Sequence, residues 1–151
     1  MHQSFHITEN SRNTLSKFLQ GYTLEQLNTI PEGYNNNLIW NIGHIVVVQQ
    51  MLVYKLSGLP MMISDEMVEK YKRGTKPDQA ATQADVDEIQ SFLFETINQT
   101  KADLEKKVFK DFQKFTTMTG FTIKTAEDAM AFNVYHEALH AGMMMSIRKF
   151  I

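Results

Sequence analysis

The chain has 151 residues, of which 43% are hydrophobic and 21% charged, as in an ordinary globular protein, and we expect one domain over residues 1–151. Fifteen basic and seventeen acidic residues, without a Lys/Arg-rich run, argue against a nucleic-acid partner. The absence of cysteine excludes disulfides, thiolate metal sites and a cysteine nucleophile. We expect a cytoplasmic protein with no membrane partner, because no stretch approaches the ~20 apolar residues of a membrane span and no secretion signal opens the chain.

Helical periodicity dominates the sequence. Four long helices are predicted, over about residues 5–20, 37–57, 82–108 and 125–151. Two short helices are predicted in the connections, at about residues 23–30 and 64–72. Residues 109–124 are mixed, and residues 116–123 within them fit either a loop or a short extended piece. Four long helices without a convincing pair of strands predict an all-α four-helix bundle with short extra helices in its connections.

The last predicted helix carries an HExxH pattern at residues 136–140. Its two histidines, four residues apart on a helix, can bind one metal ion. Zinc proteases with this pattern take a third ligand from downstream, but the eleven residues after His140 contain no His, Asp, Glu or Cys. A third protein ligand must therefore lie upstream. His2 and His6 lie at a terminus that is expected to fray, which leaves His44 in the second long helix.

Helical spacing places these three histidines on apolar stripes. The stripe in the last helix contains Ala129, Phe132, His136, His140, Met143, Ile147 and Phe150. The stripe in the second helix contains Trp40, His44, Val47, Met51 and Tyr54. Each histidine alone could be a core residue bonded to a neighbouring hydroxyl or carbonyl. Three of them on core stripes, two at positions i and i+4, favour a shared metal site, because bundles build such sites from inward-pointing side chains.

Two further residues of the last helix have an expected role. Glu137 follows His136 and lies about 100° around the helix from it, so it is the candidate catalytic base, or a hydrogen-bond acceptor behind the site. The alternative is a solvated or salt-bridged glutamate on a partly exposed flank. Gly142 is interpreted as a place where another helix approaches closely.

The run at residues 136–142, followed by the basic and apolar end at 147–151, resembles the C-terminal helix of the DinB/YfiT-like proteins, whose usual form there is HExxHxGQ. Upstream, residues 24–28, 31–37 and 40–45 are similar in order and spacing to the stretch that leads into the first metal-binding histidine of that family. The resemblance covers most of the chain. Met143 stands where the family usually has Gln, which affects polar contacts with a substrate or behind the metal ligands.

The resemblance implies a four-helix bundle, often a homodimer, with a divalent metal ion such as nickel or zinc held by His44, His136 and His140. It also implies a small-molecule substrate, since characterised members include thiol S-transferases that use bacillithiol, a mycothiol-dependent isomerase and metal-dependent hydrolases. Three neutral imidazoles leave an open position where a divalent ion can lower the pKa of a bound group.

Two classes of function remain open from the sequence. One is a metal-dependent enzyme, most simply a transferase of an external low-molecular-weight thiol, with a small metal-dependent hydrolase as its nearest variant. The other is a non-catalytic bundle that keeps the histidines as a structural or vestigial metal site. Met143 favours the second class, whereas three histidines without an evident fourth protein ligand favour the first.

Overall fold

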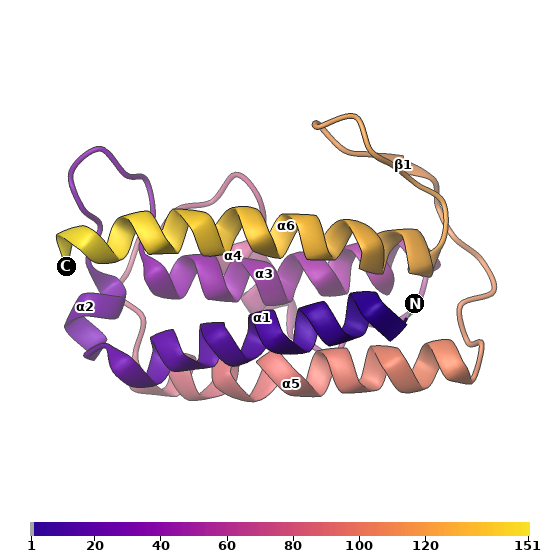
Figure 1. Cartoon of the computed structure of the whole chain (residues 1–151), viewed down its shortest axis with the longest axis horizontal. Helices are drawn as coiled ribbons and strands as arrows, with labels where there is room; N and C mark the ends of the chain where they lie inside the picture. Colours follow the sequence, from indigo (N-terminus) through magenta and orange to yellow (C-terminus); the bar gives the residue numbers. More distant parts are fainter. Residues whose placement is uncertain (1) are drawn as a thin grey trace.

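The computed structural model describes residues 2–151 and is built around four long helices (Figure 1). They are α1 (His2–Gly21), α3 (Leu38–Val53), α5 (Gln83–Glu105) and α6 (Ala126–Ile147). Helices α1 and α6 run in one direction, and α3 and α5 run in the opposite direction. Both α1 and α3 pack against α5 and against α6. This arrangement confirms the predicted all-α four-helix bundle.

The connections carry short elements. They are α2 (Leu24–Asn28), the 3-10 helix η1 (Lys55–Ser57), α4 (Asp65–Tyr71), the hairpin strands β1 (Phe115–Thr116) and β2 (Thr122–Ile123), and the 3-10 helix η2 (Arg148–Phe150). In the hairpin, Phe115 lies opposite Ile123 and Thr116 opposite Thr122 in an antiparallel pair. The hairpin projects from the bundle near the start of α6 (Figure 1). The segment that the sequence left open therefore contains both a loop and an extended piece.

Side-chain caps explain where five helices begin. In each case a Ser, Thr or Asn side chain accepts a hydrogen bond from a backbone N–H of the first turn, which has no partner within the helix. These caps are Thr23 for α2, Asn37 for α3, Ser64 for α4, Thr82 for α5 and Thr125 for α6. The last of them fixes the start of α6, and with it the angular position of every later residue in that helix.

Helix α3 is the central element of the bundle. Fourteen of its sixteen residues are buried, because α4, α5 and α6 all pack around it. Its sequence is accordingly apolar on nearly every side, with the polar residues Asn41, His44, Gln49 and Gln50 as buried exceptions. A polar group buried here needs a partner, since an unpaired one costs about 1–3 kcal/mol. These four residues therefore mark places where the core contains specific hydrogen bonds as well as apolar packing.

The buried face of α6 differs from the predicted stripe. It contains Ala126, Ala129, Met130, Asn133, Glu137, His140, Met144 and Ile147. The prediction was wrong for Met143, which is 40% exposed, and for Phe150, which is 64% exposed. The prediction followed the spacing of the apolar residues and histidines, whereas the buried face includes the polar Asn133 and Glu137, which bond to each other and, through Glu137, to Arg12. None of the helices within residues 2–151 is both long enough and apolar enough to cross a lipid bilayer.

Candidate metal centre

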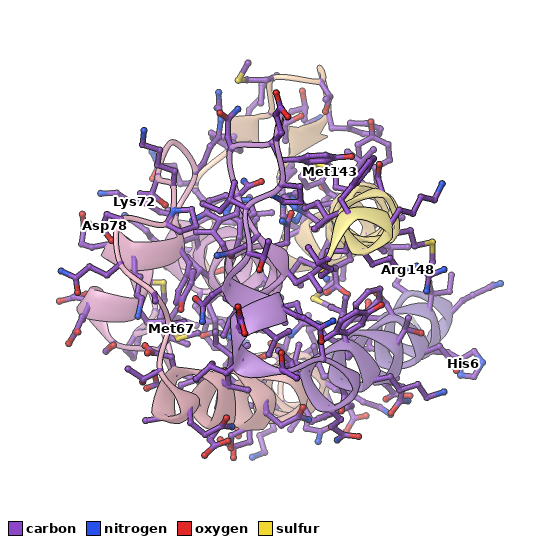
Figure 2. The ribbon with its side chains drawn as sticks, turned by 90° about the vertical axis from the view of Figure 1, so that its left-hand side faces the viewer. His6, Met67, Lys72, Asp78, Met143 and Arg148 are labelled. Carbon is purple, nitrogen blue, oxygen red and sulfur yellow. The ribbon has the colours of Figure 1, made fainter. Side chains whose placement is uncertain are left out.

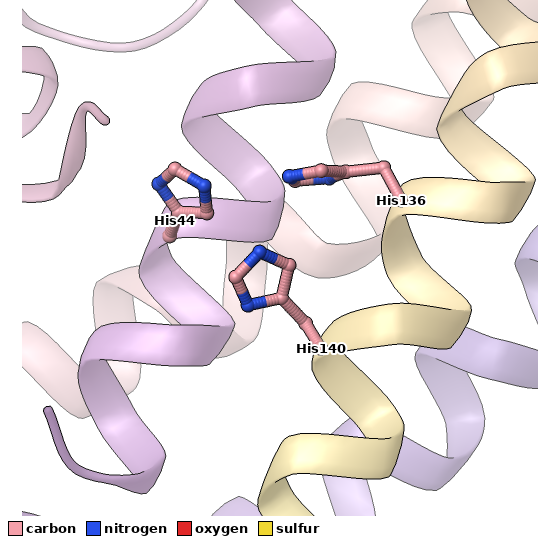
Figure 3. A group of neighbouring side chains, drawn as sticks. All are labelled: His44, His136 and His140. Carbon is pink, nitrogen blue, oxygen red and sulfur yellow. The ribbon is translucent and has the colours of Figure 1, made fainter. Parts of the chain in front are cut away.

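Helices α3 and α6 bring together the three histidines that the sequence analysis named. His44 projects from α3 toward His136 and His140 on α6 (Figure 3). One ring nitrogen from each histidine lies within 4.8 Å of the others. The ring centroids are 5.2 Å apart for His44 and His136, 4.7 Å for His44 and His140, and 4.6 Å for His136 and His140. The group is compact enough to hold one metal ion.

A backbone carbonyl fixes the protonation of the His44 ring. The Nδ1 atom of His44 lies 2.7 Å from the carbonyl oxygen of Tyr71, at the end of α4. A carbonyl only accepts, so Nδ1 carries the proton and Nε2 keeps its lone pair. The Trp40 ring stacks on the other side, with centroids 4.7 Å apart and planes at 12°. His44 is thus held in one orientation with a free nitrogen, as metal-ligating histidines are in proteins.

Asn41 does the same for His140. The His140 Nδ1 lies 2.8 Å from the Asn41 Oδ1. The Asn41 amide nitrogen donates to the Asn37 carbonyl oxygen at 2.7 Å, so the amide oxygen is the atom that faces His140. His140 therefore donates from Nδ1 and keeps the Nε2 lone pair. Asn41 precedes His44 by about one helical turn, so α3 supplies both one of the three histidines and the side chain that orients another.

His136 is held by packing instead of by a hydrogen bond. Its ring stacks against Phe132, with centroids 6.2 Å apart and planes at 29°. Its Nδ1 atom is buried and has no hydrogen-bond partner within residues 2–151. A buried polar atom without a partner is costly, and a group bound within the cluster can recover part of that cost by engaging the ring.

Burial keeps all three imidazoles neutral. Burial lowers the pKa of His44, although the hydrogen bond to Tyr71 opposes this shift. Burial, reinforced by the positive charges that His140, His44 and Arg12 would bring, lowers the pKa of His136 to about 3. Burial and the charge of His44 lower the pKa of His140 to about 3. Neutral imidazole is the form that binds metal, so the histidines are prepared to act as ligands at neutral pH.

The donor set fits a divalent ion. Three neutral imidazoles suit zinc, nickel, copper or iron, and no Asp, Glu or Cys belongs to the group among the residues that the structure describes. In His44 and His140 the Nδ1 atom already bonds to an acceptor, which leaves the lone pair of each Nε2 atom facing the centre of the group. Three protein ligands leave at least one coordination position open, as in catalytic zinc sites.

Glu137 points away from the histidines. Its side chain is 1% exposed, and its Oε1 accepts from Arg12 Nε at 2.9 Å and from the Asn133 amide at 2.8 Å. Arg12 Nη2 lies 2.8 Å from the same oxygen. Arg12 belongs to α1, so the carboxylate lies between α1 and α6 inside the bundle. Of the alternative interpretation, the salt bridge is present but the partly exposed flank is not, because the partner that allows burial lies 125 positions upstream.

A cavity of about 320 Å³ opens beside His44 and His136. Its other lining residues are Val48, Met51, Leu52, Lys72, Arg73, Phe115, Thr117, Met118, Thr119, Phe132, Tyr135 and Leu139. This cavity could not be predicted from the sequence, because its walls come from α3, α6, the hairpin and the loop after α4. Met143 does not line it within the described chain, so the departure from the family pattern there lies outside the cavity wall.

Comparisons with known proteins bear on the fold and on the family of the chain. The crystal structure of "the conserved protein of locus from Enterococcus faecalis" superposes with a TM-score of 0.67, covering 99% of this chain and 95% of that chain at 14% identity. At that identity the likeness shows the fold alone. No curated protein sequence matches the chain. Residues 7–144 match the sequence profile of the DinB superfamily, which is nearly the whole bundle and includes all three histidines. The chain therefore belongs to the DinB superfamily.

Proposed function

We propose that the chain is a divalent-metal-dependent enzyme that transfers an external low-molecular-weight thiol to a small-molecule electrophile. The observation that carries this proposal is the convergence of three neutral imidazoles beside a cavity of about 320 Å³. His44, His136 and His140 would hold the ion, with nickel and zinc among the metals that imidazole suits. When bound, such an ion lowers the pKa of a water or thiol in its open position toward neutrality.

The residues around the site supply orientation and a dry environment. The bonds to Tyr71 and Asn41 hold two imidazoles in place, so no reorganisation of the ligands is needed. The apolar walls of the cavity would hold the electrophile and exclude water. In the reaction, the thiol loses its proton to solvent, its sulfur forms a bond to the electrophilic carbon, and the bond from that carbon to the leaving group breaks. The chain has no cysteine, so the thiol must come from outside.

The composition of the cavity supports thiol transfer over hydrolysis. A general base within hydrogen-bond reach of the attacking water typically accelerates ester or amide hydrolysis by about 10²–10⁴-fold. No carboxylate lines the cavity within residues 2–151. Glu137 does not line the cavity; it lies in the bundle interior, where its Oε1 accepts from Arg12 and Asn133. We therefore propose Glu137 as a positioning residue that holds α6 against α1, in place of the base expected from its position in the motif.

The proposal is tested with untagged protein, either metal-loaded or metal-free, and with His140→Ala. Each is assayed for conjugation of several low-molecular-weight thiols to 1-chloro-2,4-dinitrobenzene, and separately for hydrolysis of p-nitrophenyl acetate without thiol. Metal analysis and circular dichroism accompany each sample. We expect thiol conjugation by the metal-loaded protein, and background rates from the other two, both still helical.

Background rates from all three samples would contradict the enzyme and favour a non-catalytic metal-binding bundle. Metal-dependent hydrolysis of the ester without added thiol would favour the hydrolase. A metal-loaded His140→Ala variant with full metal content would remove the basis of the proposal, because it would show that the ion is held elsewhere.

A further inference from the structure

The charged groups around the cavity are all of one sign. Lys72 and Arg73 line it, together with two imidazoles, and no acidic residue does so within the described chain. The remaining walls are mainly apolar, from residues such as Met51, Leu52 and Phe132. A divalent ion at the histidines would add further positive charge at the inner end. The cavity therefore combines an apolar body with a cationic rim.

The two cations differ in their availability. Lys72 Nζ lies 2.5 Å from the carboxylate of Glu69, one turn earlier. Arg73 is exposed and forms no ion pair among residues 2–151. Its guanidinium can therefore receive a ligand without losing an existing partner, and its planar fork suits a carboxylate, sulfonate or phosphate group.

The loop that carries Arg73 is fixed to the metal centre. The Tyr71 carbonyl, two residues before Arg73, accepts from His44. Two residues after Arg73, the Thr75 hydroxyl lies 2.8 Å from the Lys72 carbonyl oxygen and accepts from Trp40 Nε1 at 3.1 Å. Gly74 turns the backbone with φ of +89°, a conformation that favours glycine. Arg73 thus projects from a turn that is tied on both sides to α3, next to His44.

We infer that the cavity binds an amphipathic anion, with an apolar segment against the cavity walls and a single anionic group paired with Arg73. This inference rests on the proposed function and deepens it, because it names the class of the electrophilic substrate. The reacting carbon of such a molecule would lie between its anionic end and the histidines. The positive charge of Arg73 favours the anionic group of the ligand, and the apolar walls of the cavity favour its apolar segment.

The test uses octanesulfonate, octanol and octylamine, three probes with the same apolar chain and different charge. Sulfonate is a poor metal ligand, which limits direct binding to the ion. Binding is followed by NMR of protein carrying ¹³C-labelled methionine methyl groups. Met51 lines the cavity and is the reporter, whereas the exposed Met143 lies outside the cavity wall and is the internal control.

We expect octanesulfonate to shift the Met51 signal, to leave Met143 unchanged, and to bind roughly two- to fivefold more tightly than octanol, as one exposed ion pair allows. Arg73→Gln should remove this preference, and Arg73→Lys should keep part of it. Arg148→Gln is the matched control, because Arg148 is exposed on a different flank of the molecule from Lys72 (Figure 2). It should behave as wild type.

Equal affinity for octanesulfonate and octanol would overturn the inference, as would a preference for octylamine or a preference for the anion that survives in Arg73→Gln. The same titrations are made on His140→Ala, which loses a proposed metal ligand that does not line the cavity. Anion preference in this variant, with no thiol transfer by any sample, would refute the proposed function and leave the binding site standing. Thiol transfer without a preference for the anion would support the proposed function and refute the anion-binding site.

Discussion

At the scale of single residues, His136 and Glu137 are adjacent in sequence but face different environments. His136 lies beside the cavity, and Glu137 lies in the bundle interior against Arg12. Both members of this ion pair are essentially unexposed, at 0% and 1%. Removing one partner of a buried pair leaves an uncompensated charge, which typically costs about 3–5 kcal/mol.

Glu137→Gln is accordingly expected to lower the free energy of unfolding by about 3–5 kcal/mol, because Arg12 would keep its charge without a carboxylate. Urea denaturation of the metal-free protein measures this loss. Metal content at saturating metal should stay close to that of wild type, since Glu137 lies outside the histidine group. Glu69→Gln is the control: it breaks a pair whose side chains are 38% and 68% exposed, and it should change stability little.

If Glu137→Gln kept wild-type stability and lost about 10²-fold or more in rate, Glu137 would be a general base after all. A stability loss with near-normal turnover of the folded fraction would support its positioning role.

The residues that sequence could identify are those with a local pattern. The spacing of His136 and His140, and the placement of His44 on an apolar helix, are readable without a structure. The burial of Arg12 could not be predicted, because no local pattern around it in α1 indicates that its side chain is fully buried. The supporting role of Asn41 had a weak signal, since it is a polar residue one turn before His44 in an apolar helix.

At the scale of elements, the contact between α3 and α4 holds the site in place. A Cβ atom on Gly43 would lie 2.7 Å from Cδ1 of the Tyr71 ring, so only glycine allows α4 to approach this closely. The carbonyl of the same tyrosine accepts from His44, the next residue after Gly43. The glycine therefore sets the distance at which α4 supports the histidine.

Gly43→Ala should move Tyr71, lower the free energy of unfolding by about 1–3 kcal/mol, and weaken metal binding by about tenfold or more as the His44 support shifts. Gly142→Ala is its matched control. A Cβ atom there would meet nothing within 4 Å, so the exposed alanine should stabilise α6 by about 0.5–1 kcal/mol. Chemical denaturation and competition with a chelator measure the two effects. Unchanged metal affinity in folded Gly43→Ala would show that Tyr71 is not needed to orient His44.

The glycines also show where prediction of elements succeeded and where it did not. Caps and hydrophobic periodicity located all four long helices and both predicted short α-helices. The interpretation of Gly142 as a close helix contact was wrong, because open space surrounds it. Close approach occurs at Gly43, against Tyr71 of α4, the next α-helix along the chain. Which glycine is crowded depends on tertiary packing, and local sequence does not contain that information.

At the scale of the whole molecule, the buried histidines link stability to pH. In the folded metal-free protein the pKa of His136 and of His140 is lowered to about 3. In the unfolded chain both return to about 6.5. Between these values the unfolded chain binds more protons, so acid favours unfolding. This contribution to stability is fully present above about pH 6.5 and is lost as the pH falls toward 3.

We therefore expect the free energy of unfolding of the metal-free protein to fall by roughly 4–5 kcal/mol between about pH 6.5 and 4.5 through these two groups. Urea denaturation at several pH values measures the slope. The same measurement on the double variant His136→Gln/His140→Gln is the control, because glutamine does not titrate and all other titratable groups remain the same. Parallel pH profiles for the two proteins would show that the histidines are not buried as neutral groups.

The cavity is built from two kinds of chain, the packed helices α3 and α6 and two of the connections between helices. The three histidines and their supports stand on long helices whose surroundings tolerate little change, whereas much of the cavity wall comes from the hairpin and from the loop at Lys72 and Arg73. Connections of this kind accept insertions and substitutions far more readily than packed helices do. Evolution can therefore change the ligand that the cavity binds without altering the histidines that would hold a metal ion. An engineer could do the same by grafting these two segments between related bundles.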